Sequence, residues 1–251
     1  MELHKTAFAR AAQGERRWSS TIFPTPAHAQ DADMATDEFA AFLETACMLD
    51  RPDPIAAWRQ LSARQAGMIA WLQERKEIHI TAPGTDLRLS VAGRSWVNSD
   101  GKRNFPSGEV FTGPVEDSVE GQVHFTYSVV TQGREVSDIR LRFAAGVVVD
   151  ASASKNEPFL IETLDTDPGA RRLDDREFAF GTNEGVTRWT KNILLDEKMG
   201  GTVHMALGLG YPETGSRNTS AIHWDMICDL RQGGEATADG EVVLRDGEYR
   251  I

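Results

Sequence analysis

Cysteine is nearly absent from this sequence of 251 residues, which contains only Cys47 and Cys228. The two residues form no CxxC pair and are too few for a disulfide framework. The apolar neighbours Met226, Ile227 and Leu230 indicate that Cys228 is buried. Because burial raises the pKa of a thiol, Cys228 is a poor candidate for a nucleophile. We therefore expect a cytoplasmic protein from a reducing compartment.

The sequence also lacks a block of basic residues and a long apolar run. Lys and Arg number 27 against 38 Asp and Glu, which gives a net charge of −11 and argues against nucleic acid or an anionic membrane as a partner. Apolar runs such as residues 144–149 are far too short to span a bilayer, and residues 1–5 show no apolar signal-peptide core. With 40% hydrophobic residues, the composition is that of a globular protein.

Helical signals are concentrated in residues 1–78. Residues 3–16 are expected to form one helix, and Thr36 can cap a second helix that ends near Leu49. Asp53 followed by Pro54 is a stronger start signal, for a helix that runs to about Lys76. This segment is therefore predicted to be mostly helical.

After Lys76 the apolar residues recur with a period of two, which is typical of strands. Asp246-Gly247 favours a type I′ turn in a closing hairpin, and Ser154 with Glu157 resembles a capping box for a helix ending near Leu164. We predict an α+β fold in which residues 79–251 are β-rich and form mixed sheets. The main expected strands cover residues 77–81, 86–92, 122–130, 137–143, 201–208, 222–230, 242–245 and 248–251.

Two histidines stand out because they lie in strand-like runs. His223 and Asp225 are two residues apart, so their side chains should project from the same face of a strand. Imidazole and carboxylate together are ligands suited to Zn²⁺, Co²⁺ or Mn²⁺. His204 follows two glycines in a second such run. A hydrogen-bonded structural pair explains an isolated His-x-Asp equally well.

Several other residues lie where they could carry chemistry. Glu109 begins an apolar strand, and Glu177 precedes another, so both carboxylates must be paired, protonated or bound to a metal if they are buried. Tyr211 lies in a turn seven residues after His204, and Glu197 lies in a short charged loop. Taken alone, each is also consistent with a structural or solvent-facing role. The sequence contains no serine-hydrolase elbow, P-loop or GxGxxG motif.

Five strings, in this order, resemble the thermophilic metalloaminopeptidase family, which includes aminopeptidases of the T and S type. The similarity extends from the first predicted helix to the last hairpin. The strings are FPSGEVFTGPVEDSV from Phe105, FGTN from Phe180, NILLDEKMGGTVHMALG from Asn192, YPETG from Tyr211 and SAIHWD from Ser220.

The resemblance implies an aminopeptidase that removes N-terminal amino acids from peptides with a free N-terminus by using two divalent metal ions. Paired cations polarise the scissile carbonyl and activate a water molecule. By the same resemblance, Tyr211 matches a catalytic tyrosine and Glu197 lies in an active-site motif. The positions that match metal ligands are Glu109, Glu177, His204, His223 and Asp225.

This sequence is shorter than the proteins it resembles. The resemblance implies that family members carry an N-terminal α/β domain before the region matched here. We expect metal binding to survive, since the ligand strings are intact, and we expect a homodimer. The ion could be zinc, cobalt, manganese or magnesium, because mixed His and carboxylate ligands accept several metals. Two alternatives stay open: a catalytically inactive homologue that acts as an interaction or regulatory module, and a metal-dependent amidase with a non-peptide substrate.

Overall fold

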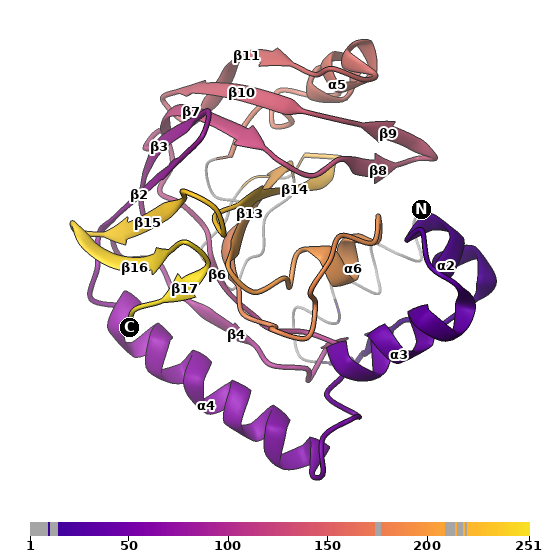
Figure 1. Ribbon diagram of the computed structural model, residues 1–251. Helices are drawn as coiled ribbons and strands as arrows, with labels where there is room; N and C mark the ends of the chain where they lie inside the picture. Colours follow the sequence, from indigo (N-terminus) through magenta and orange to yellow (C-terminus); the bar gives the residue numbers. More distant parts are fainter. Residues whose placement is uncertain (1–9, 11–14, 174–176, 209–213, 215–217, 219) are drawn as a thin grey trace.

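The computed structural model describes residue 10 and residues 15–173, 177–208, 214, 218 and 220–251 (Figure 1). Strands form most of its regular structure, and the predicted α+β class is confirmed. No helix within these described ranges is long and apolar enough to cross a membrane. The helices are α2 (Pro26–Asp31), α3 (Thr36–Ala46), α4 (Pro54–Leu72), α5 (Glu157–Leu164) and α6 (Ile193–Asp196).

Two large antiparallel sheets make up the body of the protein. The first has the strand order β11-β10-β7-β3-β2-β15-β16-β17, and the second has the order β14-β13-β12-β6-β4. β1 (Ser20–Thr21) pairs in parallel with β5 (Asn104–Phe105). A small hairpin joins β8 (Val129–Thr131) to β9 (Arg134–Val136).

The strands of the first sheet are β2 (Glu77–Ala82), β3 (Thr85–Ser90), β7 (Glu120–Phe125), β10 (Ile139–Ala144), β11 (Val147–Ser152), β15 (Glu235–Ala238), β16 (Glu241–Arg245) and β17 (Glu248–Tyr249). The strands of the second sheet are β4 (Val97–Ser99), β6 (Glu109–Thr112), β12 (Glu177–Gly181), β13 (Thr202–Gly208) and β14 (His223–Asp229).

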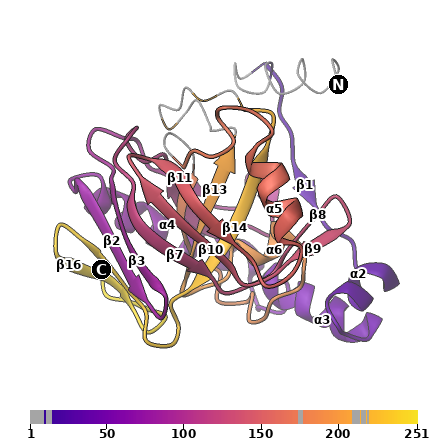
Figure 2. The same cartoon turned by 90° about the horizontal axis from the view of Figure 1, so that it is seen from above.

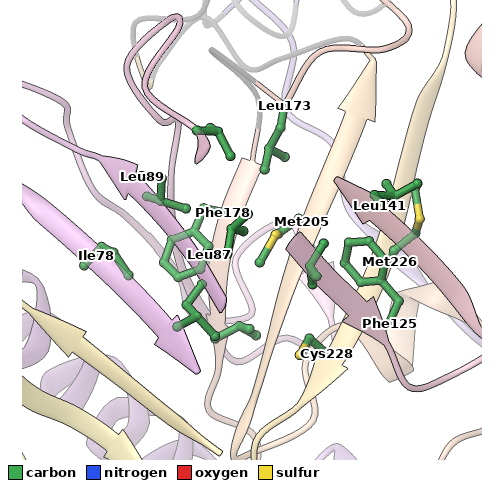
Figure 3. Packing of buried hydrophobic residues seen from close by; sticks show 14 of the residues in the cluster. Ile78, Leu87, Leu89, Phe125, Leu141, Leu173, Phe178, Met205, Met226 and Cys228 are labelled. Atoms are coloured by element: carbon green, nitrogen blue, oxygen red, sulfur yellow. The ribbon is translucent and has the colours of Figure 1, made fainter. Parts of the chain in front are cut away.

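The main hydrophobic core lies between these two sheets (Figures 2 and 3). Leu87 and Leu141 come from the first sheet, and Phe178, Met205 and Met226 come from the second; all five are at most 1% exposed. Since successive side chains of a strand point to opposite faces, packing one face into this core leaves the other face of each sheet for polar groups.

The long helix α4 lies beside the second sheet, whereas α5 packs against β11 of the first sheet and against β9. Asp53 Oδ1 accepts a hydrogen bond from Ala56 N at 2.9 Å, so the predicted cap of α4 is confirmed. α4 packs along β4 and β6. α2 and α3 share a separate apolar cluster with Leu195 of α6, which ties the helical segment to the loop that follows β12.

Local sequence signals located most elements but not all of their ends. Asp246 and Gly247 both have positive φ, as the predicted type I′ turn requires. The predicted strand 122–130 is interrupted after Phe125, because Thr126 N bonds to Ile227 O of the second sheet at 3.1 Å. α5 starts at Glu157, whose carboxylate accepts from Ala153 N rather than from Ser154. The helix predicted for residues 3–16 lies largely outside the described residues.

Candidate metal centre

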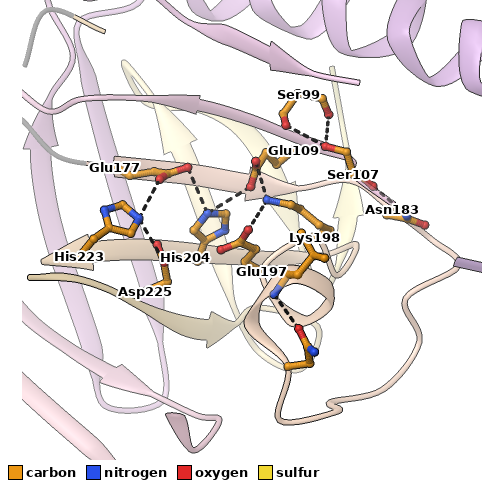
Figure 4. Close-up of polar contacts among 12 residues, drawn as sticks. Ser99, Ser107, Glu109, Glu177, Asn183, Glu197, Lys198, His204, His223 and Asp225 are labelled. Carbon is orange, nitrogen blue, oxygen red and sulfur yellow. Dashed lines mark hydrogen bonds and ion pairs between the residues drawn. The ribbon is translucent and has the colours of Figure 1, made fainter. Parts of the chain in front are cut away.

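Four neighbouring strands of the second sheet carry the predicted metal ligands on the face that points away from the core. On β13, Val203, Met205 and Leu207 enter the core, so His204 projects from the opposite face. The same alternation on β6, β12 and β14 places the remaining predicted ligands on that face (Figure 4): Glu109, Glu177, His223 and Asp225.

Small residues between these side chains leave room for them. Ala206 of β13 pairs with Glu177 on one side and with Asp225 on the other. Ala179 pairs with His204. Because cross-strand neighbours lie only about 5 Å apart, larger residues at the two alanine positions would fill the space between the charged groups.

The five side chains form a continuous chain of contacts. His204 Nε2 lies 3.3 Å from Glu109 Oε2 and 3.5 Å from Glu177 Oε1. His223 Nε2 lies 3.8 Å from Glu177 Oε2 and 3.2 Å from Asp225 Oδ2. All of these residues except His223 are nearly inaccessible to solvent.

Several atoms of this cluster are buried without a hydrogen-bond partner of acceptable geometry. Among the described residues they include Glu109 Oε2, Asp225 Oδ1 and both ring nitrogens of His204. A buried polar atom without a partner is destabilising, and such atoms call for an explanation. Divalent cations bound by these residues would satisfy the two carboxylate oxygens and one imidazole nitrogen, so the residues present fit metal ions.

Two groups of three potential ligands share one member. Glu109, Glu177 and His204 form one group, and Glu177, His223 and Asp225 form the other. In each group the ligand atoms lie within 4.8 Å of one another. Mixed imidazole and carboxylate ligands suit zinc, cobalt or manganese. Because a carboxylate has two oxygens, Glu177 is placed to serve both groups.

Lys198 is a member of the cluster that the sequence did not reveal. Its side chain is 1% exposed, and its Nζ lies 2.6 Å from Glu109 Oε1 and also donates to Glu197 Oε1. Next to Glu197 in a charged loop, a lysine looks like an ordinary solvated residue. Gly200 and Gly201, which follow soon after, are a local signal that the backbone there packs closely against another segment.

Burial and neighbouring charges shift the pKa values of the cluster. Burial, together with the charges of Glu109 and Asp225, raises the pKa of Glu177. Burial also raises the pKa of Glu197 to about 8. Although burial opposes it, contact with Glu177 and Glu109 raises the pKa of His204 to about 9. Although burial opposes it, the attraction of the nearby His223 lowers the pKa of Asp225 to about 2. The cluster without metal therefore holds protons that a cation would displace.

Asn183 connects the loops around the centre. Its side-chain Nδ2 donates to Ala46 O at 2.9 Å and to Ser107 O at 2.8 Å, and its backbone N donates to Lys198 O at 2.9 Å. Gly108 has a φ of +122°, and a Cβ there would lie 2.7 Å from Asn183 Cβ. This close approach requires glycine, and it sets the position of the strand that begins with Glu109.

A cavity of about 260 Å³ opens beside the cluster. Glu109, Glu177 and Glu197 line it, together with Asn98 and Phe111. A molecule bound in this cavity would contact these three carboxylates directly. The predicted catalytic Tyr211 lies outside the described residues.

Comparison with protein families connects this geometry with a known group. The model of the thermophilic metalloproteases (M29) matches residues 1–249. This chain belongs to that family. The resemblance found in the sequence strings is thereby confirmed.

Curated relatives of this M29 member are named aminopeptidases. Aminopeptidase 2 of Geobacillus stearothermophilus is 32% identical over 92% of this chain and 65% of its own length. Aminopeptidase T of Thermus aquaticus is 29% identical over 92% of this chain and 60% of its own length. The chain thus spans less than two thirds of these relatives.

Solved structures support the same fold. The structure titled wild-type AmpT from Thermus thermophilus has a TM-score of 0.71 and 29% identity, covering 79% of this chain and 56% of that one. A 2,5-dihydroxypyridine dioxygenase of Pseudomonas putida has a TM-score of 0.68 at 15% identity, covering 98% of this chain and 75% of that one, which shows a shared fold. Function must therefore be argued from the side chains rather than from the fold.

Proposed function

We propose that this M29 protein is an aminopeptidase region that binds two divalent cations and removes N-terminal amino acids from peptides. The observation that carries the proposal is the pair of ligand groups that share Glu177 and contain buried atoms without partners. The names of the relatives point to the same activity.

Glu109 and His204 would hold one cation, His223 and Asp225 the other, and Glu177 would lie between them. When bound, two such ions supply Lewis-acid polarisation of the scissile carbonyl and a lowered pKa for the attacking water. Zinc, cobalt, manganese and magnesium are all candidates for these ions.

The chain's own residues would bind the peptide and move the proton. The cavity beside the cluster is open to a peptide N-terminus, whose ammonium group is attracted by the surrounding carboxylates. Glu197 lines the same cavity and is proposed as the group that accepts a proton and returns it to the leaving amine. Tyr211 is proposed as the hydrogen-bond donor to the developing oxyanion.

The decisive experiment is titration of the metal-free protein with Zn²⁺ and Co²⁺ while hydrolysis of a leucyl anilide is measured. We expect two equivalents to bind and hydrolysis to begin, with both lost in Glu177→Gln. Glu184→Gln is the matched control, because Glu184 is a surface residue whose side chain is 77% exposed and paired with Arg64.

The other outcomes separate the alternatives. Two ions bound without turnover would favour the inactive interaction module, and hydrolysis of simple amides without aminoacyl anilides would favour an amidase. Absence of metal binding would refute the proposal. We also propose a cytoplasmic homodimer, which light scattering of the purified protein and fractionation of the source cells would test.

A further inference from the structure

The ammonium group of Lys198 lies between two carboxylates for which the proposed function gives different roles (Figure 4). Its Nζ contacts Oε1 of Glu109, a proposed ligand, at 2.6 Å, and Oε1 of Glu197, a proposed proton carrier. Because the lysine side chain is 1% exposed, water does not weaken either contact appreciably.

Glu197 is itself positioned as a potential ligand. One of its oxygens lies within 4.8 Å of ligand atoms of His204 and Asp225, in a third group of the same kind as the other two. Carboxylate oxygens bind all of the candidate cations. Neither the chemistry of the Glu197 carboxylate nor its distance from His204 and Asp225 therefore explains why Glu197 should not bind a metal ion.

Lys198 is fixed in place by its backbone. Lys198 N donates to Leu195 O at 3.0 Å, and Asn183 N donates to Lys198 O at 2.9 Å. A Cβ at Gly181 would lie 2.1 Å from Met199 O and 3.1 Å from the carbonyl carbon of Lys198, so the strand and this loop are in direct contact. The backbone of Lys198 is therefore held on both sides, and its side chain is 1% exposed.

We propose that Lys198 is a positioning residue that keeps Glu197 outside the metal shell and restricts Glu109 to one ligating oxygen. This inference rests on the proposed metal centre. Lys198 occupies Oε1 of both glutamates, and its positive charge repels a cation from that side. Glu109 Oε2, 3.3 Å from His204 Nε2 and without a hydrogen-bond partner, is then the oxygen available to a metal.

The proposal makes an unusual prediction for Lys198→Met. Removing a residue that contacts a proposed ligand should strengthen metal binding, because it frees two carboxylate oxygens and removes one positive charge. Hydrolysis should nevertheless slow, because Glu197 becomes a ligand and no longer carries the proton. Lys198→Arg keeps the charge and should behave like the unaltered protein.

The test is calorimetric titration of the metal-free variants with Co²⁺, combined with the visible absorption spectrum of the bound ion. Lys198→Met should lower the Kd of at least one ion by about tenfold or more and change the spectrum, because the number of ligands changes. Glu197→Gln alone should leave Kd and spectrum unchanged. The double variant restores the net charge and removes the recruited ligand, so it should lose the part of the change that comes from Glu197 and keep the part that comes from the freed Oε1 of Glu109.

Lys191→Met is the matched control, because Lys191 pairs with Asp33 at 3.1 Å outside the cluster; its Kd should not change. The inference is overturned if Lys198→Met binds Co²⁺ with an unchanged or higher Kd, or if Glu197→Gln alone weakens binding. If Lys198→Met fails to fold, Glu197→Gln and Lys198→Arg still decide the question. Failure of the unaltered protein to bind Co²⁺ would instead refute the proposed function, and the inference with it.

Discussion

Replacing Glu177 by Gln should remove nearly all of the stabilisation that divalent ions give this protein, because both proposed ion sites use this residue. A ligand present at 100 times its Kd stabilises the native state by about 2.7 kcal/mol. Two such ions therefore contribute about 5 kcal/mol. At about 2–4 °C per kcal/mol for a chain of this size, the thermal midpoint should rise by roughly 10–20 °C.

The two ligand groups give different expectations for different variants. If the loss of Glu177 raises the Kd of each site about 100-fold, the same metal concentration stabilises the native state by only about 0.4 kcal/mol per site. His223 belongs to one group alone, so His223→Gln should keep about half of the stabilisation. Without metal, Glu177→Gln should be no less stable than the unaltered protein, because burial raises the pKa of Glu177 and thus favours its uncharged form.

The assay is thermal unfolding followed by circular dichroism, with a chelator or with Zn²⁺. Glu184→Gln, the exposed control, should show the full metal-dependent shift. The reasoning fails if Glu177→Gln keeps as much of the shift as His223→Gln, since Glu177 would then serve only one ion. It also fails if Glu177→Gln unfolds well below the unaltered protein in chelator.

Three further predictions concern the rest of the molecule. Phe178→Ala should lower the free energy of unfolding in urea by about 3–5 kcal/mol, because its ring is fully buried in the core. Burial raises the pKa values of Cys47 and Cys228 to about 11, so neither thiol should react with a disulfide reagent at about pH 8 until the protein is unfolded; reaction in the native state would contradict this. Burial also raises the pKa of Asp196, whose Oδ1 accepts from Thr190 N, to about 7, well above its unfolded value of about 4. The native state then binds more protons than the unfolded state between these values, so the free energy of unfolding should fall as pH rises through this window, and Asp196→Asn should flatten the slope.

Alternation along single strands was the part of this site that the local residue pattern could predict, whereas the full set of five ligand positions came from the family resemblance. The two-residue spacing of His223 and Asp225 placed both side chains on one face, as the structure has them. Apolar residues on either side of His204 indicated a strand, which β13 confirms. Periodicity is a local property, so it could be read without knowing which strands are neighbours.

What could not be predicted depends on contacts between distant segments. Nothing local says that β6 and β13 both flank β12, and this order is what brings Glu109 within reach of His204. Lys198 looks solvated in the sequence, because its burial arises only when the loop closes over the sheet. The end of the strand at Phe125 likewise follows from a bond to Ile227 in the other sheet.

The bonds of Asn183 also limit how far this protein could be shortened. Its amide joins the end of α3, at Ala46, to the loop before β6, and its backbone holds the loop of Lys198. Deleting the first helices through α3 would remove one of these acceptors, and we expect this to loosen the loop beside the proposed ligands. The smallest unit that keeps this centre therefore includes α3, although that helix supplies none of the proposed ligands.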